Sequence, residues 1–482
     1  MQHQDTACRK ACIFAAIKKI VLFLKTRFTS MIKKLLALFL LFTAFSLKSQ
    51  VNITIQLEQT NDSAYYLARY YGDKFQMVDT TFAEKGLINY RAAENYPSGI
   101  YLLVDAKKAR LMEFLLENDQ QFAITNSSSI ENSGIKCEGS VMTQLFFEQM
   151  QQSNAIYGQL QQLPQTAEEQ PKRDELLASL DVLKNEIITQ YPDSLFSKIL
   201  LAMTEPQVPE NLREDQKGAY YYYKSNFWNN IDLSDERLLR TPLINSKLEQ
   251  YFDQLLPQIP DTISQEIDKL IDKTQGNTVM RDYLIWHFTD QYQNPKIMGL
   301  DQVFIHLADN YFAKLEIANT SPSVREKILS RADQIRKLTL GSPAPDLWLV
   351  DTTDSFRSFK DIKTDYLILF FWDHDCGVCK KELQVLKELY AAENKDFEVF
   401  AIAANVDFPA WKNYIIENDL TWVNVNGMKS MTEDFHDLYD IYGTPVIYVL
   451  NKERKIIAKR IKAEQIPLVI EHNQKSRQNV KQ

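Results

Sequence analysis

Cys376 and Cys379, two cysteines separated by two residues, are the pair whose types and spacing point most directly to chemistry. Such a pair at the junction of a strand and a helix is typical of a redox dithiol. The strand-like run Tyr366–Trp372 precedes it, and a helix-like run begins at Lys380. Cys376 would lie at a helix N-terminus, where unpaired backbone N–H groups and the helix dipole favour thiolate over thiol. We predict Cys376 as the nucleophile and Cys379 as the resolving thiol that attacks the mixed disulfide.

Two other uses of a cysteine pair are disfavoured by the rest of the sequence. A structural zinc site needs four ligands, and after residue 49 the chain has Cys137 as its only further cysteine, without a Cys or His pair at zinc-finger spacing. A purely structural disulfide is sterically possible at this spacing. It would leave the flanking strand, the helix and a later Thr-Pro turn unexplained.

Further segments on both sides of the cysteines extend the pattern. Gly341–Asp346 precedes the first expected strand, Phe371-Trp372 stands just before the dithiol, and Gly443–Pro445 opens a late strand at Val446–Leu450. With these segments, residues 338–470 resemble the thioredoxin superfamily. Within that superfamily they resemble the extracytoplasmic thiol-disulfide oxidoreductases of the TlpA/ResA type.

The resemblance implies a C-terminal α/β thioredoxin fold over residues 337–475. In that family the proline that matches Pro445 is cis and faces the cysteines, a geometry that an X-Pro bond adopts at low cost. The backbone of Thr444 would then be free to pair with an extended substrate segment. Trp372, Thr444 and Pro445 are accordingly expected to bind substrate. No cofactor is expected besides the redox-active disulfide of the Cys376–Cys379 pair.

The chain departs from the family in the groups that would move protons. Thioredoxin carries a buried carboxylate six residues before its first cysteine, where this chain has Phe370. Glu382, six residues after Cys376, matches a glutamate that TlpA/ResA-type proteins place near the dithiol. As a partly buried carboxylate it could act in catalysis by exchanging protons with Cys379. It could equally be a first-turn acid that the helix dipole favours, and both roles stay open.

The N-terminal segment predicts export. Met31 is followed by Lys33-Lys34, the largely apolar run Leu35–Leu47 and the polar Lys48–Gln50. This order of basic, apolar and small residues is typical of a signal peptide, here residues 31–49. The apolar run is too short to span a bilayer as a stable helix.

Residues 1–30 are interpreted as an over-extended start upstream of the initiator Met31. In a competing interpretation Ile13–Leu24 and Leu35–Leu47 are membrane-inserted helices, but Lys18-Lys19 inside the first run disfavours it. No cysteine follows the apolar run at a lipoprotein cleavage position. We therefore expect a protein of the periplasm or cell envelope of a Gram-negative bacterium, a natural setting for an exported dithiol.

The net charge disfavours two classes of partner. The whole chain has a net charge of −8 at pH 7, and residues 1–49 contain nine Lys or Arg and one Asp, so removing their net +8 leaves −16. An acidic chain of this kind is a poor binder of nucleic acid or of anionic membranes. The remaining 433 of the 482 residues suffice for two or three domains.

Residues 50–140 predict an all-β sandwich domain. Val51, Ile53 and Ile55 alternate with polar residues, and similar short runs recur at 64–70, 99–105, 111–116 and 121–126. These patterns indicate antiparallel strands. Cys137, at the end of this segment, is expected to be buried and inert, because burial is the commonest fate of a free cysteine.

Residues 141–336 predict an α-helical domain, since apolar residues recur at helical spacing and prolines divide the segment into short helices. The aromatic run Tyr220–Tyr223 could form a partner-binding surface. The favoured interpretation is helix packing with mixed exposure. His287 and His306 have no second ligand at metal spacing, so no metal is predicted here.

The sequence thus predicts a multidomain protein with an all-β sandwich, a helical middle domain and a C-terminal thioredoxin fold. The favoured function is that of a periplasmic thiol-disulfide oxidoreductase that reduces disulfides of envelope proteins through Cys376 and Cys379. A membrane electron donor would then reduce the oxidised protein again. The alternative is an envelope binding or assembly protein in which the first two domains carry the function and the dithiol is vestigial or regulatory.

Overall fold

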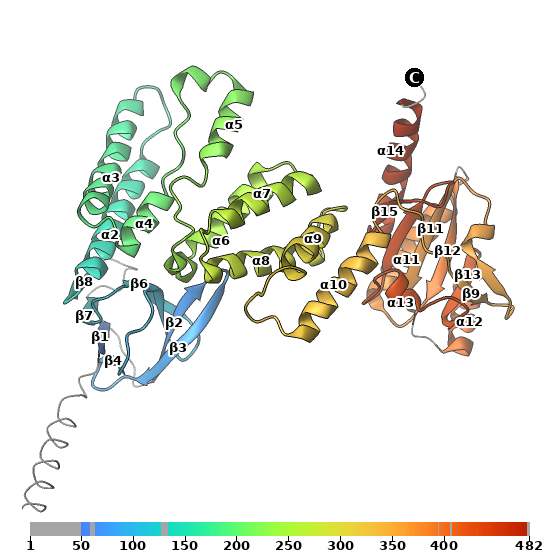
Figure 1. Ribbon diagram of the computed structural model, residues 1–482, viewed down its shortest axis with the longest axis horizontal. Helices are drawn as coiled ribbons and strands as arrows, with labels where there is room; N and C mark the ends of the chain where they lie inside the picture. The colour runs from blue at the N-terminus through green and yellow to red at the C-terminus, as the bar shows by residue number, and fades with distance from the viewer. Residues whose placement is uncertain (1–49, 58–62, 127–133, 394, 405–406, 480–482) are drawn as a thin grey trace, which may run out of the picture. The chain divides into compact units, whose positions relative to one another are not determined.

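The computed structural model describes residues 50–57, 63–126, 134–393, 395–404 and 407–479 (Figure 1). The predicted signal peptide and the residues before it lie outside this range. The chain divides into two compact units. The first comprises the residues up to Thr204 with Arg237–Ile244, and the second Glu205–Glu236 with the residues from Asn245 onward. The predicted helical segment, residues 141–336, is therefore shared between the two units.

The first unit begins with two four-stranded sheets, whose strand orders are β4-β1-β7-β8 and β3-β2-β5-β6. The strands are β1 (Val51–Leu57), β2 (Ala64–Tyr71), β3 (Lys74–Phe82), β4 (Ile88–Ala92), β5 (Gly99–Val104), β6 (Arg110–Leu116), β7 (Gln121–Asn126) and β8 (Ile135–Glu138). Apolar alternation explains their packing, because Ile53 of one sheet shares a buried cluster with Leu67 and Leu103 of the other. The predicted all-β sandwich is confirmed.

The strand pairing differs from the sequence prediction in one respect. β1 runs parallel to β7, with Ile53 opposite Phe122, where only antiparallel strands were expected. Local alternation gives no sign of this pairing, because the two strands are far apart in the sequence. The sequence analysis also missed β3, β4 and β8. β3 exposes Phe75, Met77 and Phe82 and lacks the usual inward apolar pattern.

Three helices complete the main part of the first unit. They are α2 (Val141–Gln162), α3 (Gln170–Gln190) and α4 (Leu195–Ala202). Ser140 caps α2, since its side chain accepts a hydrogen bond from the N–H of Thr143 at 3.4 Å. Phe147 of α2 is fully buried in the core of the sandwich. Pro164 and Pro192 lie in the breaks between these helices, as their missing N–H groups require.

The helices between residue 205 and the C-terminal domain are short. They are α5 (Gln216–Asn226), α6 (Leu243–Leu248), the π-helical turn Glu249–Leu255, α7 (Pro260–Asp272), α8 (Thr278–Gln293), α9 (Asp301–Leu307), a second π-helical turn at Ala308–Phe312, and α10 (Pro322–Lys337). The predicted helical middle is confirmed. Tyr221 of α5 is exposed, whereas Phe227 and Trp228 just after it are buried, which agrees with packing of mixed exposure.

The C-terminal domain is built on a seven-stranded sheet of order β10-β9-β13-β12-β11-β14-β15. Strands β11, β12 and β13 are parallel, and β14 is antiparallel to β11. The elements are β9 (Trp348–Asp351), β10 (Phe356–Ser358), β11 (Tyr366–Trp372), α11 (Gly377–Tyr390), β12 (Phe397–Ala403), α12 (Phe408–Glu417), β13 (Val423–Ser430), α13 (Phe435–Leu438), β14 (Val446–Leu450), β15 (Ile456–Lys459) and α14 (Ile466–Asn479). The predicted thioredoxin fold is confirmed.

Strand β11 is buried on both faces of this sheet, which explains its unbroken apolar sequence. On one face Phe370 shares a cluster with Leu383 of α11, and on the other Leu369 shares a cluster with Phe435 of α13. The strand thereby fixes the point at which the chain leaves the sheet and enters α11. That point is the position of the two cysteines.

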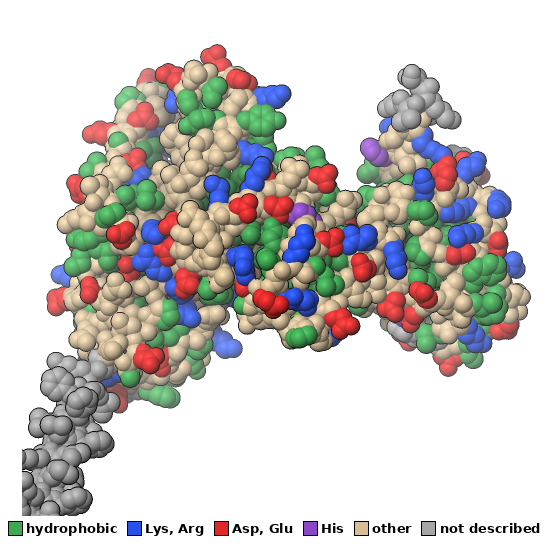
Figure 2. Space-filling view, viewed as in Figure 1, with side chains coloured by type: hydrophobic (Ala, Val, Ile, Leu, Met, Phe, Trp, Pro, Cys, Tyr) green, Lys and Arg blue, Asp and Glu red, His purple; other side chains and the backbone are tan. Residues whose placement is uncertain are grey.

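The visible surface carries charges of both signs. On the face shown in Figure 2, Lys and Arg side chains lie among Asp and Glu side chains, and neither sign gathers into one large patch.

Within the described ranges, no helix has both the length and the apolar character needed to cross a membrane.

Candidate active site

Cys376 is the N-cap residue of α11, so its expected place at a helix N-terminus is confirmed. Its backbone is extended, with φ −81° and ψ 116°, and its Sγ accepts a hydrogen bond from the backbone N–H of Cys379 at 3.2 Å. A sulfur in this position receives one of the N–H groups that the helix leaves unpaired. The geometry therefore favours a negative charge on this sulfur.

Hydrogen bonds make the Cys376 thiol more acidic than an ordinary thiol. Partial burial opposes ionisation, but it is outweighed by hydrogen bonds from the Cys379 thiol and from the backbone N–H groups of Cys379 and Val378. The Thr444 side chain adds a further hydrogen bond. Together these interactions lower the pKa of Cys376, and the side chain remains partly exposed to a substrate.

Cys379 lies in the opposite environment. Its side chain is fully buried in the cluster that contains Phe370 and Leu383. Burial, followed by the interaction with Cys376, raises the pKa of Cys379 to about 11. The two thiols are free in this structure, and they differ in acidity in the order expected for a nucleophile and a resolving thiol.

The loop before β14 lies beside the nucleophile. We call Asp440–Pro445 the cis-proline loop, because the Thr444–Pro445 peptide bond is cis, as expected. The Cys376 Sγ lies 3.6 Å from the carbonyl oxygen of Thr444 and donates to it as a thiol. Thr444 and Pro445 are both half-buried. The structure therefore brings together Cys376, Cys379, Thr444 and the cis-proline.

Trp372 does not lie on the substrate side of this site. Its indole is 1% exposed, is stacked with Phe370 at a centroid distance of 6.2 Å, and lies 5.5 Å from the ring of Tyr414. The sequence places Trp372 at the end of a strand whose residues are all buried. Trp372 can therefore support the site from beneath, but it does not offer the surface for substrate that we had expected.

The carboxylate of Glu382 is engaged by the backbone. It accepts a hydrogen bond from the N–H of Ala463 at 2.6 Å. Ala463 begins the short helix Ala463–Gln465 that leads into α14. Glu382 thus connects α11 with the start of α14, as a carboxylate does when it satisfies an unpaired N–H at a helix start.

Tyr414 of α12 is a neighbour of the dithiol that the sequence analysis missed. Its ring lies 5.5 Å from that of Trp372 and 5.8 Å from that of His374. Burial, followed by the charge of Cys379, raises the pKa of Tyr414. The sequence contains only an indirect signal for Tyr414. Since β12 is parallel to β11, the helices that follow these strands, α12 and α11, start at the same edge of the sheet.

The loop between β11 and Cys376 is polar. The imidazole of His374 lies 3.6 Å from a carboxylate oxygen of Asp373 and 3.5 Å from one of Asp375, distances at which a protonated ring forms ion pairs. Ligand atoms of these three residues fall within 4.8 Å of one another. Adjacent residues of an acidic loop often meet this geometry without an ion, and we assign no metal to them.

Two family models match this chain. Residues 340–459 match the AhpC/TSA family, and residues 148–338 match a domain of unknown function, DUF5106. A relative named thiol-disulfide oxidoreductase ResA, from Bacillus thuringiensis subsp. konkukian, is 29% identical over 133 residues, which are 27% of this chain and 73% of the relative. ResA of Bacillus subtilis is 26% identical over 118 residues, or 24% of this chain and 64% of the relative.

Solved structures include similar proteins. A domain of a possible thiol-disulfide isomerase from Cytophaga hutchinsonii is 38% identical, with coverage of 30% of this chain and 97% of that chain and a TM-score of 0.28. A thioredoxin-like protein from Bacteroides caccae is 20% identical, with coverage of 56% and 98% and a TM-score of 0.46. The chain therefore has a thioredoxin-like domain that is similar to relatives named thiol-disulfide oxidoreductase ResA, and this domain follows a domain of unknown function.

Proposed function

We propose that this chain reduces disulfides of proteins in the periplasm through Cys376 and Cys379. The observation that carries the proposal is the difference in acidity between the two thiols. Cys376 is partly exposed with a lowered pKa, whereas Cys379 is buried with a pKa of about 11. A thiolate that a partner can reach is the group needed to begin thiol-disulfide exchange.

The reaction follows in two balanced steps. The Cys376 thiolate attacks one sulfur of a substrate disulfide, the substrate S–S bond breaks, and a mixed disulfide forms as the other substrate sulfur leaves as a thiolate. Cys379 then gives up its proton, which neutralises the departing thiolate, and attacks the Cys376 sulfur. The second substrate sulfur leaves as a thiolate that takes a proton from water, so the substrate becomes a dithiol, and its two electrons come from the cysteine pair, which becomes a disulfide.

The cis-proline loop supports the binding of substrate in this scheme. Once Cys376 is ionised it no longer donates to the Thr444 carbonyl, which lies 3.6 Å away and can then accept an N–H from an extended substrate segment. Thr444 and Pro445 are therefore the substrate-binding residues of the proposal. Trp372 supports them from the buried side.

The place of the reaction is part of the proposal. The basic and apolar run at residues 31–49 would export the chain, and an oxidising compartment supplies protein disulfides as substrates. Each turnover leaves the Cys376–Cys379 pair oxidised. A membrane electron donor is therefore needed to restore the dithiol, and disulfide-bearing envelope proteins are the proposed partners.

Insulin reduction tests the proposal. The chain from Gln50 onward should accelerate the reduction of insulin by dithiothreitol, and Cys376→Ser should abolish the acceleration. A chain without this activity would favour the alternative of a binding or assembly protein with a vestigial dithiol. The reduction potential decides the direction of electron flow, since a value near about −270 mV is typical of a reductant and one near about −120 mV of an oxidase.

A further inference from the structure

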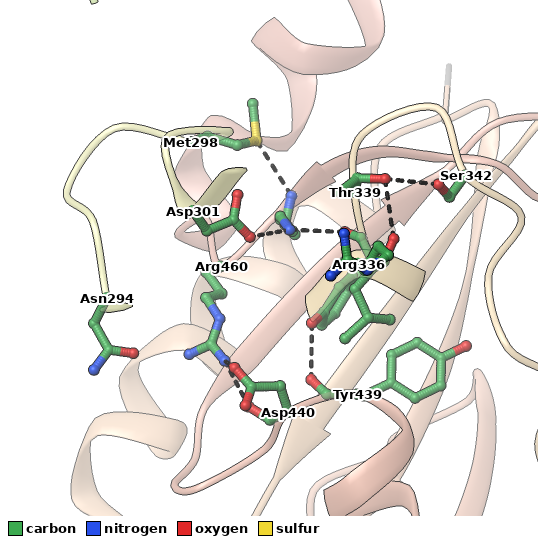
Figure 3. A network of polar contacts seen from close by, with 12 residues as sticks. Asn294, Met298, Asp301, Arg336, Thr339, Ser342, Tyr439, Asp440 and Arg460 are labelled. Carbon is green, nitrogen blue, oxygen red and sulfur yellow. Dashed lines mark hydrogen bonds and ion pairs between the residues drawn. The ribbon is translucent and has the colours of Figure 1, made fainter. Parts of the chain in front are cut away.

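The cis-proline loop is fastened by a residue that lies outside the thioredoxin-like domain. Arg331 of α10 directs its Nε to Asp440 Oδ1 at 3.3 Å and its Nη2 to Asp440 Oδ2 at 3.4 Å. From within the domain, Arg460 donates to the same carboxylate at 2.6 Å (Figure 3). Asp440 is 4% exposed and has a positive φ of 52°. A buried carboxylate is costly without charged partners, and the two guanidinium groups supply them to Asp440.

Arg331 is held by its own part of the chain. Its guanidinium donates to the carbonyl oxygen of Gln293 at 3.0 Å, to the side chain of Gln293 at 3.3 Å and to the side chain of Asn294 at 2.8 Å. These acceptors lie at the end of α8, and the Arg331 side chain is 15% exposed. A planar guanidinium with so many fixed acceptors has a defined position. We call residues 245–336 the helical region; through Arg331 it helps Arg460 to fix the position of Asp440.

The same guanidinium supports an exposed aromatic ring. Arg331 lies 5.0 Å from the ring centroid of Tyr442, at a distance typical of a cation–π contact. Tyr442 is 73% exposed and stands two residues before Thr444, whose carbonyl contacts Cys376. Val378, two residues after Cys376, is also 59% exposed. Exposed Val378 and Tyr442 thus stand two residues from Cys376 and from its contact Thr444, respectively.

We propose that the helical region takes part in substrate recognition by the thioredoxin-like domain. Arg331 is a positioning residue that fixes the cis-proline loop, and Tyr442 is a specificity-determining residue that contacts an apolar side chain beside the substrate disulfide. The inference rests on the proposed disulfide reduction and adds a substrate class, a polypeptide with an apolar residue near its cystine. A small disulfide that reaches only Cys376 does not need either residue.

A separate contact already fastens the helical region to the domain. The Lys459 side chain of β15 forms a buried ion pair with Asp301 of α9 and donates to the carbonyl oxygen of Leu338 at 2.7 Å. The backbone N–H of Lys459 donates to the sulfur of Met298 at 3.3 Å. Asp301 and Met298 are labelled in Figure 3. Domain association therefore does not depend on Arg331 alone. Lys459→Met provides a comparison that removes this ion pair but none of the hydrogen bonds to Asp440.

The test measures kcat and KM of Arg331→Met in the chain from Gln50 onward with two substrates, insulin and hydroxyethyl disulfide. We expect KM for insulin to rise about threefold to tenfold, because an interface residue that matters contributes about that factor in affinity. Values for hydroxyethyl disulfide should not change. The pH profile of Cys376 alkylation should also stay as in the wild type, and Arg331→Lys should restore part of the loss.

Arg325→Met is the matched control, because Arg325 lies on the same helix and bonds to the Leu315 carbonyl at 3.0 Å and to Glu316. It should leave both KM values unchanged. Tyr442→Ala should reproduce the rise in KM for insulin, and since its ring is exposed the variant decides the question even if Arg331→Met fails to fold. When Arg331→Met and Tyr442→Ala are combined, the KM for insulin should rise no further than in the single variant with the larger rise.

Several results would overturn the inference. One is a KM for insulin that stays at the wild-type value in Tyr442→Ala and in a folded Arg331→Met. Another is an equal loss on both substrates with a shifted alkylation profile, which would mean damage to the dithiol itself. A third is a KM for insulin that rises as much in Lys459→Met as in Arg331→Met, which would mean that Arg331 acts only by joining the helical region to the domain. A wild-type chain that reduces neither substrate would refute the proposed function instead, which separates the two failures.

Discussion

The starts of α2 and α11 each lie beside a cysteine, yet the two thiols have opposite acidity. At α11 the cysteine is itself the N-cap, and the Cys376 sulfur accepts the N–H of Cys379. At α2 the N-cap is Ser140, whose hydroxyl accepts the N–H of Thr143. Cys137 stands three residues before this cap, and its backbone hydrogen bond with Ser140 favours ionisation less than burial opposes it.

The surroundings of Cys137 act in the opposite direction. Its side chain is 7% exposed in the core of the sandwich, and its Sγ donates to the carbonyl oxygen of Ser140 at 3.9 Å. Burial raises the pKa of Cys137 to about 11. The comparison shows that nearness to a helix start does not activate a thiol. The sulfur must occupy the cap position and must be partly exposed.

Removal of each thiol in turn should give the largest difference between the two regions. We expect Cys376→Ser to lower insulin reduction by at least about a thousandfold, because a serine hydroxyl does not ionise and does not form the mixed disulfide. Cys137→Ser should leave turnover unchanged. A large loss in the Cys137 variant, with the fold intact by circular dichroism, would break the comparison.

The pH dependence of the alkylation rate should show the second largest difference between the thiols. A thiol reacts as its thiolate, so a lowered pKa makes Cys376 reactive at neutral pH, while Cys137 and Cys379 become reactive only as pH rises towards about 11. An ordinary thiol of pKa about 8.5 is already ionised about three hundred times more than one of pKa about 11 at pH 7. Iodoacetamide followed by peptide mass spectrometry should therefore label Cys376 at least about a hundredfold faster. Earlier labelling of Cys379 would reverse the two assigned roles.

Local sequence signals were sufficient for the position of the dithiol. The unbroken apolar run of β11 and the polar helix that follows determine where a central strand ends and α11 begins. The two cysteines at that junction could therefore be placed at a helix N-terminus from the sequence alone. The same reasoning located the sandwich through the alternation in β1, where inward residues are fully buried.

Contacts between distant residues could not be predicted in this way. Glu382 bonds to the N–H of Ala463, and Arg331 bonds to Asp440, across 81 and 109 residues of chain. Neither pair carries a local pattern, because each contact depends on the final packing of two separate elements. Trp372 was misjudged for a related reason, since a residue at the end of a buried strand can point to the core instead of the groove.

Stability at alkaline pH gives a smaller test of the region around Cys137. The folded pKa is raised to about 11, so the thiol stays neutral in the folded chain while the unfolded chain ionises above about 8.5. The contribution of this thiol to stability is complete below about pH 8.5 and is lost as pH rises towards 11. Relative to Cys137→Ala, wild-type stability should fall by about 2 kcal/mol between pH 7.5 and 10.

Urea unfolding of both chains at the two pH values measures this difference. Groups common to both chains cancel in the comparison, including the many tyrosines that burial makes less acidic. A constant difference in the free energy of unfolding between wild type and Cys137→Ala across this range would mean that Cys137 ionises freely in the folded chain. The contrast with Cys376 would then be smaller than the burial of the two side chains indicates.

The smallest expected effect comes from substitution of Glu382. This substitution tests whether the acidity of the Cys376 thiol depends only on the start of α11 or also on this carboxylate. If the carboxylate serves to bind the N–H of Ala463, then Glu382→Gln keeps an acceptor oxygen and should cost only about 1 kcal/mol of stability. The pH profiles of Cys376 and Cys379 alkylation should not move, because their hydrogen bonds come from the backbone, Thr444 and each other. If the carboxylate instead exchanges protons with Cys379, the second step should slow, and the Cys379 profile should shift while stability is unchanged. Single-turnover decay of the mixed disulfide, measured beside thermal unfolding, distinguishes the two roles, since only proton exchange would change that rate.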